Sequence, residues 1–374
     1  MHALPPSIAT LKLEIKKTKT EVGGYVDAHL SRARRAFSLL VVHSLAVATV
    51  GMVGCEAELR LEGIEKTKSQ PIRRTDQFAS LLQAGDGTLI ALADHGVLIE
   101  ASPQDYATSP INWTRVELPE SPNFIASTAC IDGSVYSLSF ENELWSRSDE
   151  GWSAVAVNTQ EQLQAVACTP SGDIWVSGAF STLLRSSDAG ASWDEFSLYE
   201  DFTLTAISFV DADTGFAVGE FGSLIKTTDG GESWEMMDPI TEDFYPLAMH
   251  FDSPEEGWVS GVLGLILHTT DGGFTWQSQK AETVASIYGF TRSEDALYAF
   301  GDLGALLRYQ EGVWIDQPSP EIPVHYASAL KLDGRVLLAG GWGVVVEVPI
   351  ATAAAEPSAN ISTSLSLSSD EEAL

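Results

Sequence analysis

Positively charged residues are scarce in this 374-residue chain, in which 21 Lys and Arg stand against 52 Asp and Glu, a net charge of −31. The first 54 residues hold seven basic and three acidic residues, so the rest holds 14 basic and 49 acidic ones, a net charge of −35. A surface this acidic repels phosphate backbones and anionic lipid headgroups. Binding to nucleic acid or to a membrane through charge is therefore not expected.

Motifs for catalysis and for metal or cofactor binding are missing as well. The seven histidines are scattered, and no Cys/His cluster has the spacing of a metal site. The sequence contains no Gly-x-Ser-x-Gly nucleophile motif, and its glycine pairs are not followed by a helix that could cradle a phosphate. We therefore predict no metal, no cofactor and no enzymatic activity.

Cysteine is rare, with three residues, and the first of them follows a leader-like segment. Residues 31–55, SRARRAFSLLVVHSLAVATVGMVGC, contain clustered arginines, an apolar run from Phe37 to about Val53, and a final Gly-Cys pair. This order resembles a bacterial lipoprotein signal, in which cleavage before Cys55 exposes a residue that is lipidated. An uncleaved membrane anchor and an ordinary secretory signal are the alternatives. Residues 1–30 are explained by a start codon assigned too far upstream.

All three signals imply export, and Glu56 after the first cysteine favours the outer membrane of a bacterial envelope. Exported proteins meet an oxidising compartment, in which Cys130 and Cys168 could form a disulfide. They could equally be two small buried apolar residues. We expect a periplasm-facing lipoprotein and leave the pairing of these two cysteines open.

A repeat dominates the rest of the chain. Three segments match the pattern Ser/Thr-x-Asp-x-Gly-x-x-Trp at steps of 41 and 42 residues, and a degenerate copy lies 39 residues upstream. A second marker, two glycine-like positions three residues apart before an apolar strand, begins seven times between residues 93 and 340 at steps of 39 to 46 residues. The repeated positions are Asp188, Gly190 and Trp193, then Asp229, Gly231 and Trp234, then Asp271, Gly273 and Trp276, with Asp149 in the degenerate copy.

One period reads as four short strands. From Leu204, LTAISFV alternates, DADTG is a turn, FAVG is a second strand, SLIKTT a third, and SWEMM follows the Asp-containing turn as a fourth. Four strands in about 40 residues are typical of a β-propeller blade. The expected fold class is all-β, a seven-bladed β-propeller of four-stranded antiparallel blades. Helical repeats are excluded because no unit holds an amphipathic stretch of about ten residues without Gly or Pro.

The ends of the repeat predict how the ring closes and where the domain stops. The last unit supplies only three strands before Pro349, so a strand around Ser69–Arg74 is expected to pair with it and remove an exposed sheet edge. The expected organisation is a signal segment over 1–54, a tether over 55–68, the propeller over 69–349 and a disordered Ser/Ala-rich acidic tail over 350–374.

The Asp-Gly-Trp turns have a structural explanation. An aspartate in a tight turn accepts hydrogen bonds from backbone N–H groups of its own loop, and a glycine two residues later tolerates a positive φ. The tryptophan then covers the end of the hairpin. A repeated ligand set for a metal or a sugar is the alternative, but each turn supplies one carboxylate and equivalent turns lie on different blades.

These turns are similar to the Asp-box, or bacterial neuraminidase repeat. Together with the glycine pair and the seven units, TTDGG-x-x-W resembles the photosystem II stability/assembly factor family of propellers over residues 75–349. The resemblance implies an exported or lumenal seven-bladed propeller without enzymatic activity, which binds an immature membrane-protein subunit and promotes its assembly. It also implies an arginine patch that contacts the client.

Basic side chains stand just before the box on four consecutive units, at Arg185, Lys226, His268 and Arg308. Repeat equivalence places them on one arc of the ring, so this basic stripe is the candidate partner-binding site of an otherwise acidic body. The alternative is that a long polar side chain merely ends each strand. The acidic balance and the general bacterial character of the signal argue against a photosystem as the client.

We therefore predict a non-enzymatic envelope lipoprotein, a monomeric ring that binds an envelope membrane protein as an assembly factor or accessory subunit. The alternative is a cell-surface carbohydrate-binding or glycosidase-like propeller, because sialidases carry the same box. A sialidase, however, needs three arginines that clamp a carboxylate and a Tyr/Glu pair. This chain has few arginines, no Arg-Ile-Pro motif near the first unit, and seven repeats rather than six.

Overall fold

The computed structural model describes residues 68–350, except for 108, 242–243, 294–295 and 321–323. The chain divides into two units, residues 1–64 and 65–374, and the described residues belong to the second. The predicted signal segment, Cys55, the tether up to residue 67 and the tail from residue 351 lie outside the described residues. Among the described residues, no helix has the length and apolar character needed to cross a membrane.

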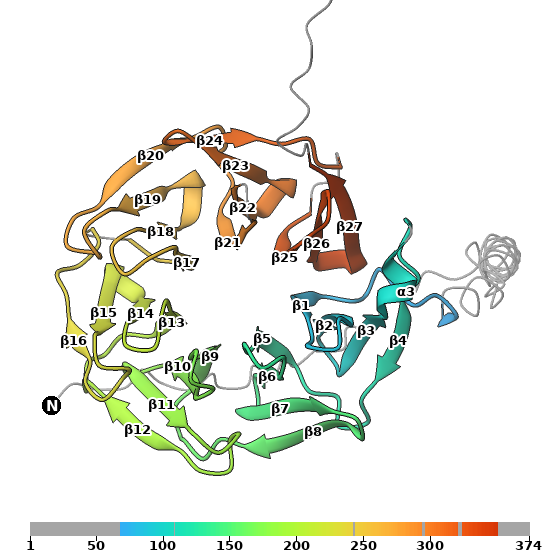
Figure 1. The fold of residues 1–374 in the computed structure, drawn as a ribbon, viewed down its shortest axis with the longest axis horizontal. Coiled ribbons are helices and arrows are strands. Elements are labelled where there is room, and N and C mark those ends of the chain that lie inside the picture. Colours follow the sequence, from blue (N-terminus) through green and yellow to red (C-terminus); the bar gives the residue numbers. More distant parts are fainter. Residues whose placement is uncertain (1–67, 108, 242–243, 294–295, 321–323, 351–374) are drawn as a thin grey trace, which may run out of the picture. The chain divides into compact units, whose positions relative to one another are not determined.

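The described chain is built of strands that follow one another in antiparallel sets around a common axis (Figure 1). The first three sets are β1 (Phe78–Gln83), β2 (Leu89–Ala93), β3 (Val97–Ala101) and β4 (Thr114–Glu117), then β5 (Phe124–Ala129), β6 (Val135–Ser139), β7 (Glu143–Ser148) and β8 (Gly151–Ala156), then β9 (Leu163–Cys168), β10 (Ile174–Gly178), β11 (Thr182–Ser186) and β12 (Asp194–Ser197). The fourth and fifth are β13 (Leu204–Phe209), β14 (Gly215–Gly219), β15 (Ser223–Thr227) and β16 (Glu235–Met236), then β17 (Ala248–Phe251), β18 (Gly257–Ser260), β19 (Ile266–Thr269) and β20 (Gln277–Ala281). The last two are β21 (Ile287–Arg292), β22 (Leu297–Gly301), β23 (Leu306–Gln310) and β24 (Val313–Asp316), then β25 (Tyr326–Leu332), β26 (Arg335–Gly340) and β27 (Val344–Pro349).

Short helical turns complete the described elements. One helical turn, α3 (Pro103–Tyr106), follows β3, and four 3-10 turns join a second strand to a third strand. These turns are η1 (Glu220–Gly222), η2 (Val262–Gly264), η3 (Asp302–Gly304) and η4 (Gly341–Gly343).

The strand pairing confirms the predicted all-β propeller of four-stranded antiparallel sheets. Among the described residues the strands fall into seven sets, which we call blades one to seven, and each of the first six has four strands in chain order. The fifth and sixth blades are joined by a short parallel pairing of β20 with β24, in which Lys280 faces Val313 and Ala281 faces Trp314.

The predicted closing strand was wrong. Residues 69–74 form turns and bends, and the described part of the seventh blade contains β25, β26 and β27 alone. Pro71 lacks the N–H group that a sheet edge needs, and Arg73 is held in an ion pair with Glu117 at 3.0 Å. Just after this segment, Asp76 contacts the last blade: the Gly343 N–H of η4 donates to the Asp76 carbonyl oxygen at 2.7 Å.

The ring is closed by side-chain packing. The described core consists of seven apolar clusters, and each is formed by two neighbouring blades. The cluster between the last and first blades joins Leu337 and Ala339 of β26 to Phe78, Leu89 and Ile99 of the first blade. All five are at most 1% exposed, so this junction is as dry as the others.

The repeated glycine pair has two separate causes. The first glycine ends a second strand where the inner strand passes closely: a Cβ on Gly219 would overlap the carbonyl oxygen of Thr203. The register of β13 with β14 shifts at this point, between Leu204 and Ala206. The second glycine, Gly222, has a φ of +71°, which most side chains rarely adopt.

Candidate partner-binding site

The basic stripe occupies equivalent positions on four third strands. Its residues lie near the ends of β11, β15, β19 and β23, and all are partly buried: Arg185, Lys226, His268 and Arg308. The Asp-boxes lie at this same end of the blades that carry them, and we call it the box face. No described hydrogen bond, ion pair or ring contact joins two of the four residues, so the structure brings them to one face without gathering them into a cluster.

Two stripe residues reach the box of the next blade. Arg185 pairs with Asp173 at 2.7 Å and with Glu232 of the following box at 2.8 Å. Hydrogen bonds to Glu232 and Asp173 raise the pKa of the Arg185 guanidinium. Lys226 Nζ donates to the carbonyl of Gly272 at 3.3 Å and lies 5.0 Å from the centre of the Phe216 ring. These side chains therefore connect blades, and the charge of Arg185 is matched by carboxylates.

The other two stripe residues differ from each other. His268 lies 3.2 Å from Glu256 Oε1, and its ring stacks on Trp258 with centroids 4.6 Å apart. Arg308 forms no ion pair with any described residue, and its Nε is buried without a hydrogen-bond partner there. Among the described residues, Arg308 therefore has no carboxylate partner, and neither does Lys226, which contacts a carbonyl and an aromatic ring.

The Asp-boxes are closed hydrogen-bond networks. Asp229 accepts hydrogen bonds from Ser233 N at 2.9 Å, Ser233 Oγ at 2.6 Å and Thr227 Oγ1 at 2.8 Å, and Gly231 N donates to Thr227 Oγ1 at 2.8 Å. The boxes of Asp188 and Asp271 repeat the same bonds. Both oxygens of each carboxylate are therefore engaged within the loop.

These bonds favour the charged form of the box aspartates. The neighbouring Ser233 hydroxyl, and then its backbone N–H, lower the pKa of Asp229 from 3.8 to about 2. Thr275 does the same to the pKa of Asp271, also to about 2, and Ser192 lowers the pKa of Asp188. A carboxylate that is charged at neutral pH and internally satisfied is suited to holding a turn.

The box also packs one blade against the previous one. Gly231 has a φ of +92°, and a Cβ there would overlap the Trp175 ring of the preceding blade. The box residue Trp234 meets the same ring edge-on, with centroids 5.5 Å apart.

In the degenerate copy the turn is tighter: Ser148 pairs with Gly151, and Asp149 lies in the hairpin between β7 and β8.

A cluster on the box face between the fifth and sixth blades was missed by the sequence analysis. His250 Nε2 lies 2.8 Å from Asp252 Oδ1, and Arg292 pairs with the other oxygen of Asp252 at 2.6 Å. Burial lowers the pKa of His250, against the opposing effect of Asp252. A His and an Asp two residues apart do not indicate a site in the sequence. The group forms because β17 pairs with β18 and because the fifth and sixth blades lie side by side.

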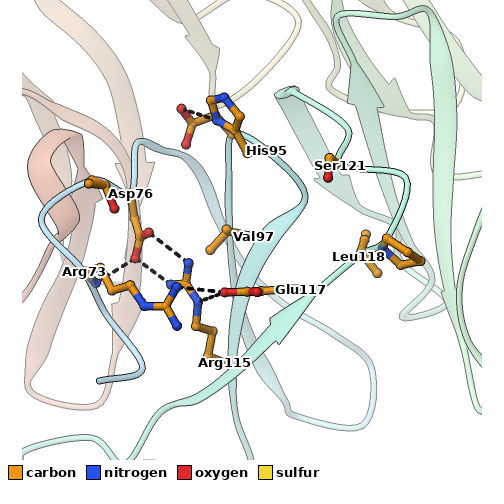
Figure 2. Close-up of a pocket in the computed structure, with 11 residues that line it drawn as sticks. Arg73, Asp76, His95, Val97, Arg115, Glu117, Leu118 and Ser121 are labelled. Carbon is orange, nitrogen blue, oxygen red and sulfur yellow. Dashed lines mark hydrogen bonds and ion pairs between the residues drawn. The ribbon is translucent and has the colours of Figure 1, made fainter. Parts of the chain in front are cut away.

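A hollow of about 590 Å³ lies beside the N-terminal segment (Figure 2). Arg115 donates to both oxygens of Asp76 at 2.8 and 3.1 Å and to Glu117 at 2.6 Å. Burial opposes the charge of Arg115, but these hydrogen bonds outweigh it and raise its pKa. With Arg73 also bound to Glu117, two guanidinium groups match two carboxylates, so the set fixes the N-terminal segment to β4.

Fold and boxes together define the class of protein, an Asp-box β-propeller. In the part of the chain that the structure describes, no group of three His, Cys, Asp or Glu side chains could hold a metal ion. Residues 144–239 and 191–284 match the family model described as photosynthesis system II assembly factor YCF48. No curated protein matches the sequence.

Solved structures with the same fold include two of that factor. YCF48 bound to D1 peptide has a TM-score of 0.58 at 14% identity and covers 74% of this chain and 93% of its own. YCF48 from Cyanidioschyzon merolae has a TM-score of 0.59 at 12% identity, with 75% and 97% covered. Virginiamycin B lyase from Staphylococcus aureus has a TM-score of 0.65 at 14% identity, with 76% and 97% covered. At these identities the structures show the fold alone, and the family model, which matches residues 144–284, shows that this part of the chain is similar to photosystem II assembly factor-like propellers.

Proposed function

We propose that the protein is a non-enzymatic envelope lipoprotein whose propeller binds a membrane-protein partner as an assembly or stability factor. The observation that carries the proposal is the match of the central blades to the YCF48 family model, because a YCF48 structure holds a D1 peptide. A peptide-binding relative supports a scaffold role for this chain. The internally satisfied Asp-boxes agree with such a role, since they serve the ring itself.

Within the basic stripe, Lys226 and Arg308 are the better candidates for a partner contact. Arg185 is occupied by two carboxylates, and His268 is stacked on Trp258. Changing Arg185 to an acid would place it against Asp173 and Glu232 and would destabilise the ring. Arg308→Glu together with Lys226→Gln tests the surface with less damage to the contacts between blades.

The test is recovery of a partner from the native membrane. The tagged full-length chain is cross-linked in cells, extracted in detergent and purified, and a membrane protein is expected to co-purify. The same purification with the Arg308→Glu/Lys226→Gln variant should lose that partner while the melting temperature stays close to that of the wild type. A wild-type chain that reaches the envelope and recovers no membrane protein would contradict the proposal.

An enzymatic or carbohydrate-binding function is the competing hypothesis, because virginiamycin B lyase shares the fold. Low identity carries no activity from that enzyme to this chain. A glycan array with turnover assays separates the two possibilities. Glycan binding or turnover by a chain without a protein partner would favour the alternative.

A further inference from the structure

Large apolar side chains are exposed at the end of the blades opposite the box face. In an antiparallel blade, the turn from the second to the third strand and the connection to the next blade lie at the same end. We call this end the turn face. Backbone hydrogen bonds hold it together: Glu220 N in η1 donates to Thr203 O of one connection, and Ile240 N of the next connection donates to Gly222 O, each at 2.9 Å.

Blades three to seven place a bulky apolar residue at the same position of this turn. The five residues and their exposed fractions are Phe180 (53%), Phe221 (68%), Leu263 (78%), Leu303 (65%) and Trp342 (57%). Tyr199 (92%) and Val284 (75%) lie in connections at the same end. Large apolar side chains exposed at the same end of five consecutive blades are typical of an interaction site.

The backbone at these five positions is left-handed. Their φ values lie between +52° for Phe180 and +61° for Phe221. Bulky side chains are disfavoured in this region, where Gly or Asn fits at lower cost. Both the left-handed backbone and the exposure of a bulky apolar side chain to water are unfavourable. Because this combination repeats on five consecutive blades, it indicates a surface that another molecule covers.

The apolar residues are flanked by negative charge. Glu220 precedes Phe221, and Asp302 precedes Leu303. The described turns and connections of this face between β2 and β27 contain no Lys or Arg. Near this end, Arg73 of the N-terminal segment and Arg115 of β4 are paired with Glu117 and Asp76, and Lys280 lies close to the end of β20. Such a face repels a second copy of itself and an anionic bilayer, and it attracts Lys and Arg.

The N-terminal segment reaches the ring at this same face. Gly343 N donates to Asp76 O at 2.7 Å beside Trp342. The apolar run predicted over Phe37–Val53 ends 15 residues before Lys68. If that run anchors the chain, the turn face stays within about 50 Å of the membrane, the reach of an extended segment of this length. A polypeptide that emerges from the membrane close to such an anchor would be within reach of this face.

We propose that the turn face binds a cationic amphipathic polypeptide segment. Its apolar side chains would cover Phe221, Leu263 and Leu303, and its Lys or Arg residues would pair with Glu220 and Asp302. The inference rests on the proposed function, because it gives the chemistry of the partner. It places this contact on the face opposite the basic stripe.

The first measurement uses a labelled amphipathic helix of Leu and Lys as the probe. Fluorescence anisotropy against the full chain should show binding that weakens as salt is raised, because charge contributes to it. A Leu/Glu helix and a Ser/Lys peptide of the same length should bind far more weakly. Equal binding of either control peptide would overturn the proposal, since it would remove the need for charge or for apolar surface.

The decisive variant carries Phe221→Gly, Leu263→Gly and Leu303→Gly. Glycine fits the left-handed positions, so the melting temperature should stay the same or rise. Affinity for the Leu/Lys helix should fall at least about tenfold, because large apolar contacts dominate such interfaces. The matched control, Phe274→Ser, removes a side chain that is 72% exposed on the box face and should bind as the wild type does. A triple variant that binds normally would refute the proposal.

Other occupants of the face give different results. Wild-type binding to phosphatidylcholine vesicles that the triple variant loses would assign the face to the bilayer and overturn the proposal. A dimer that the triple variant loses would assign it to a second copy. Co-purification separates this inference from the proposed function. A partner that the triple variant retains contradicts the inference alone, whereas a wild-type chain without a partner contradicts the proposed function.

Discussion

At the scale of single residues, the box aspartates act through hydrogen bonds within their own loops. Asp229 and Asp271 each bind a hydroxyl and a backbone N–H four residues later, and this is the cause of their low pKa values, about 2. A carboxylate whose pKa is lower in the folded state stabilises the fold at any pH above its unfolded value. The contribution disappears as the pH falls through the folded pKa.

We therefore expect the box aspartates to shape acid unfolding. Wild-type stability should fall between about pH 4 and about pH 2, the window between the ordinary value of 3.8 and the folded value. The double variant Asp229→Asn/Asp271→Asn should melt a few degrees lower at neutral pH and lose less stability in that window. Thermal melts at several pH values check this. Parallel pH profiles for both chains would contradict it.

Glycine at the third box position should be required for packing as well as for conformation. Gly231→Ala adds a Cβ that overlaps the Trp175 ring, and we expect a loss of roughly 2–4 kcal/mol. The matched control is Gly172→Ala, where φ is +96° but no atom lies within 4 Å of the added Cβ, so about 1 kcal/mol is expected. Urea unfolding of both variants measures the difference. Equal losses would show that the Trp175 contact contributes nothing.

The sequence predicts the hydrogen bonds inside the Asp-box turns better than the contacts of these turns with neighbouring blades. The pattern of Asp, Gly and Trp predicts a hydrogen-bonded turn because its bonds run between residues at most four apart. It cannot reveal that Arg185 faces Glu232, because that contact depends on how two blades lie side by side. For the same reason the exposed position of Phe221 was not predicted.

At the scale of elements, a disulfide links the second and third blades. Cys130, just after β5, and Cys168, at the end of β9, form a disulfide with their Cα atoms 5.4 Å apart. It connects the inner strands of the second and third blades. The question that the sequence left open is thus settled in favour of pairing, and it could not be settled earlier because both explanations require the same small residue.

Removing the disulfide should destabilise the ring without changing its fold. The bond closes a segment with a sequence separation of 38, for which the chain-entropy model gives about 4 kcal/mol. Cys130→Ala/Cys168→Ala should lose roughly this amount in denaturant unfolding. The wild type treated with a reductant should behave like the variant, and the variant should not respond to the reductant. A wild type that is insensitive to reduction would contradict the estimate.

The missing closing strand shows where element-level prediction fails. Three strands in the last unit favour a fourth strand from the other end of the chain, and Ser69–Arg74 was placed there. That expectation follows from unpaired sheet edges, but Pro71 and the ion pairs of Arg73 and Arg115 hold this segment in a different path. Period and strand order could be read from local patterns, whereas a long-range ion pair could not.

At the scale of the whole molecule, stability depends on seven equivalent junctions among the described blades. Each is an apolar cluster shared by two neighbours, and the junction between the last and first blades is buried and apolar like the rest. If that junction closes the ring, a cavity there should cost as much as a cavity elsewhere.

The comparison of two leucines tests this closure. Leu337 lies at the junction of the last and first blades and Leu224 at the junction of the fourth and fifth, and both are 0% exposed. Replacement of either by Ala should destabilise the protein by about 2–5 kcal/mol. Denaturant unfolding of the two variants provides the measurement. A much smaller loss for Leu337→Ala would mean that the ring opens at this junction before it unfolds.

The disulfide also has a consequence for the cell. Disulfides persist in oxidising compartments and are rare in the cytosol, so the state of Cys130 and Cys168 records where a molecule has been. Molecules retained inside the cell would carry two free thiols that alkylating reagents mark, and molecules that have crossed the membrane would carry none at these positions. The mass of the alkylated protein from intact cells would therefore show directly whether the protein has been exported, without a tag, an antibody or knowledge of its partner.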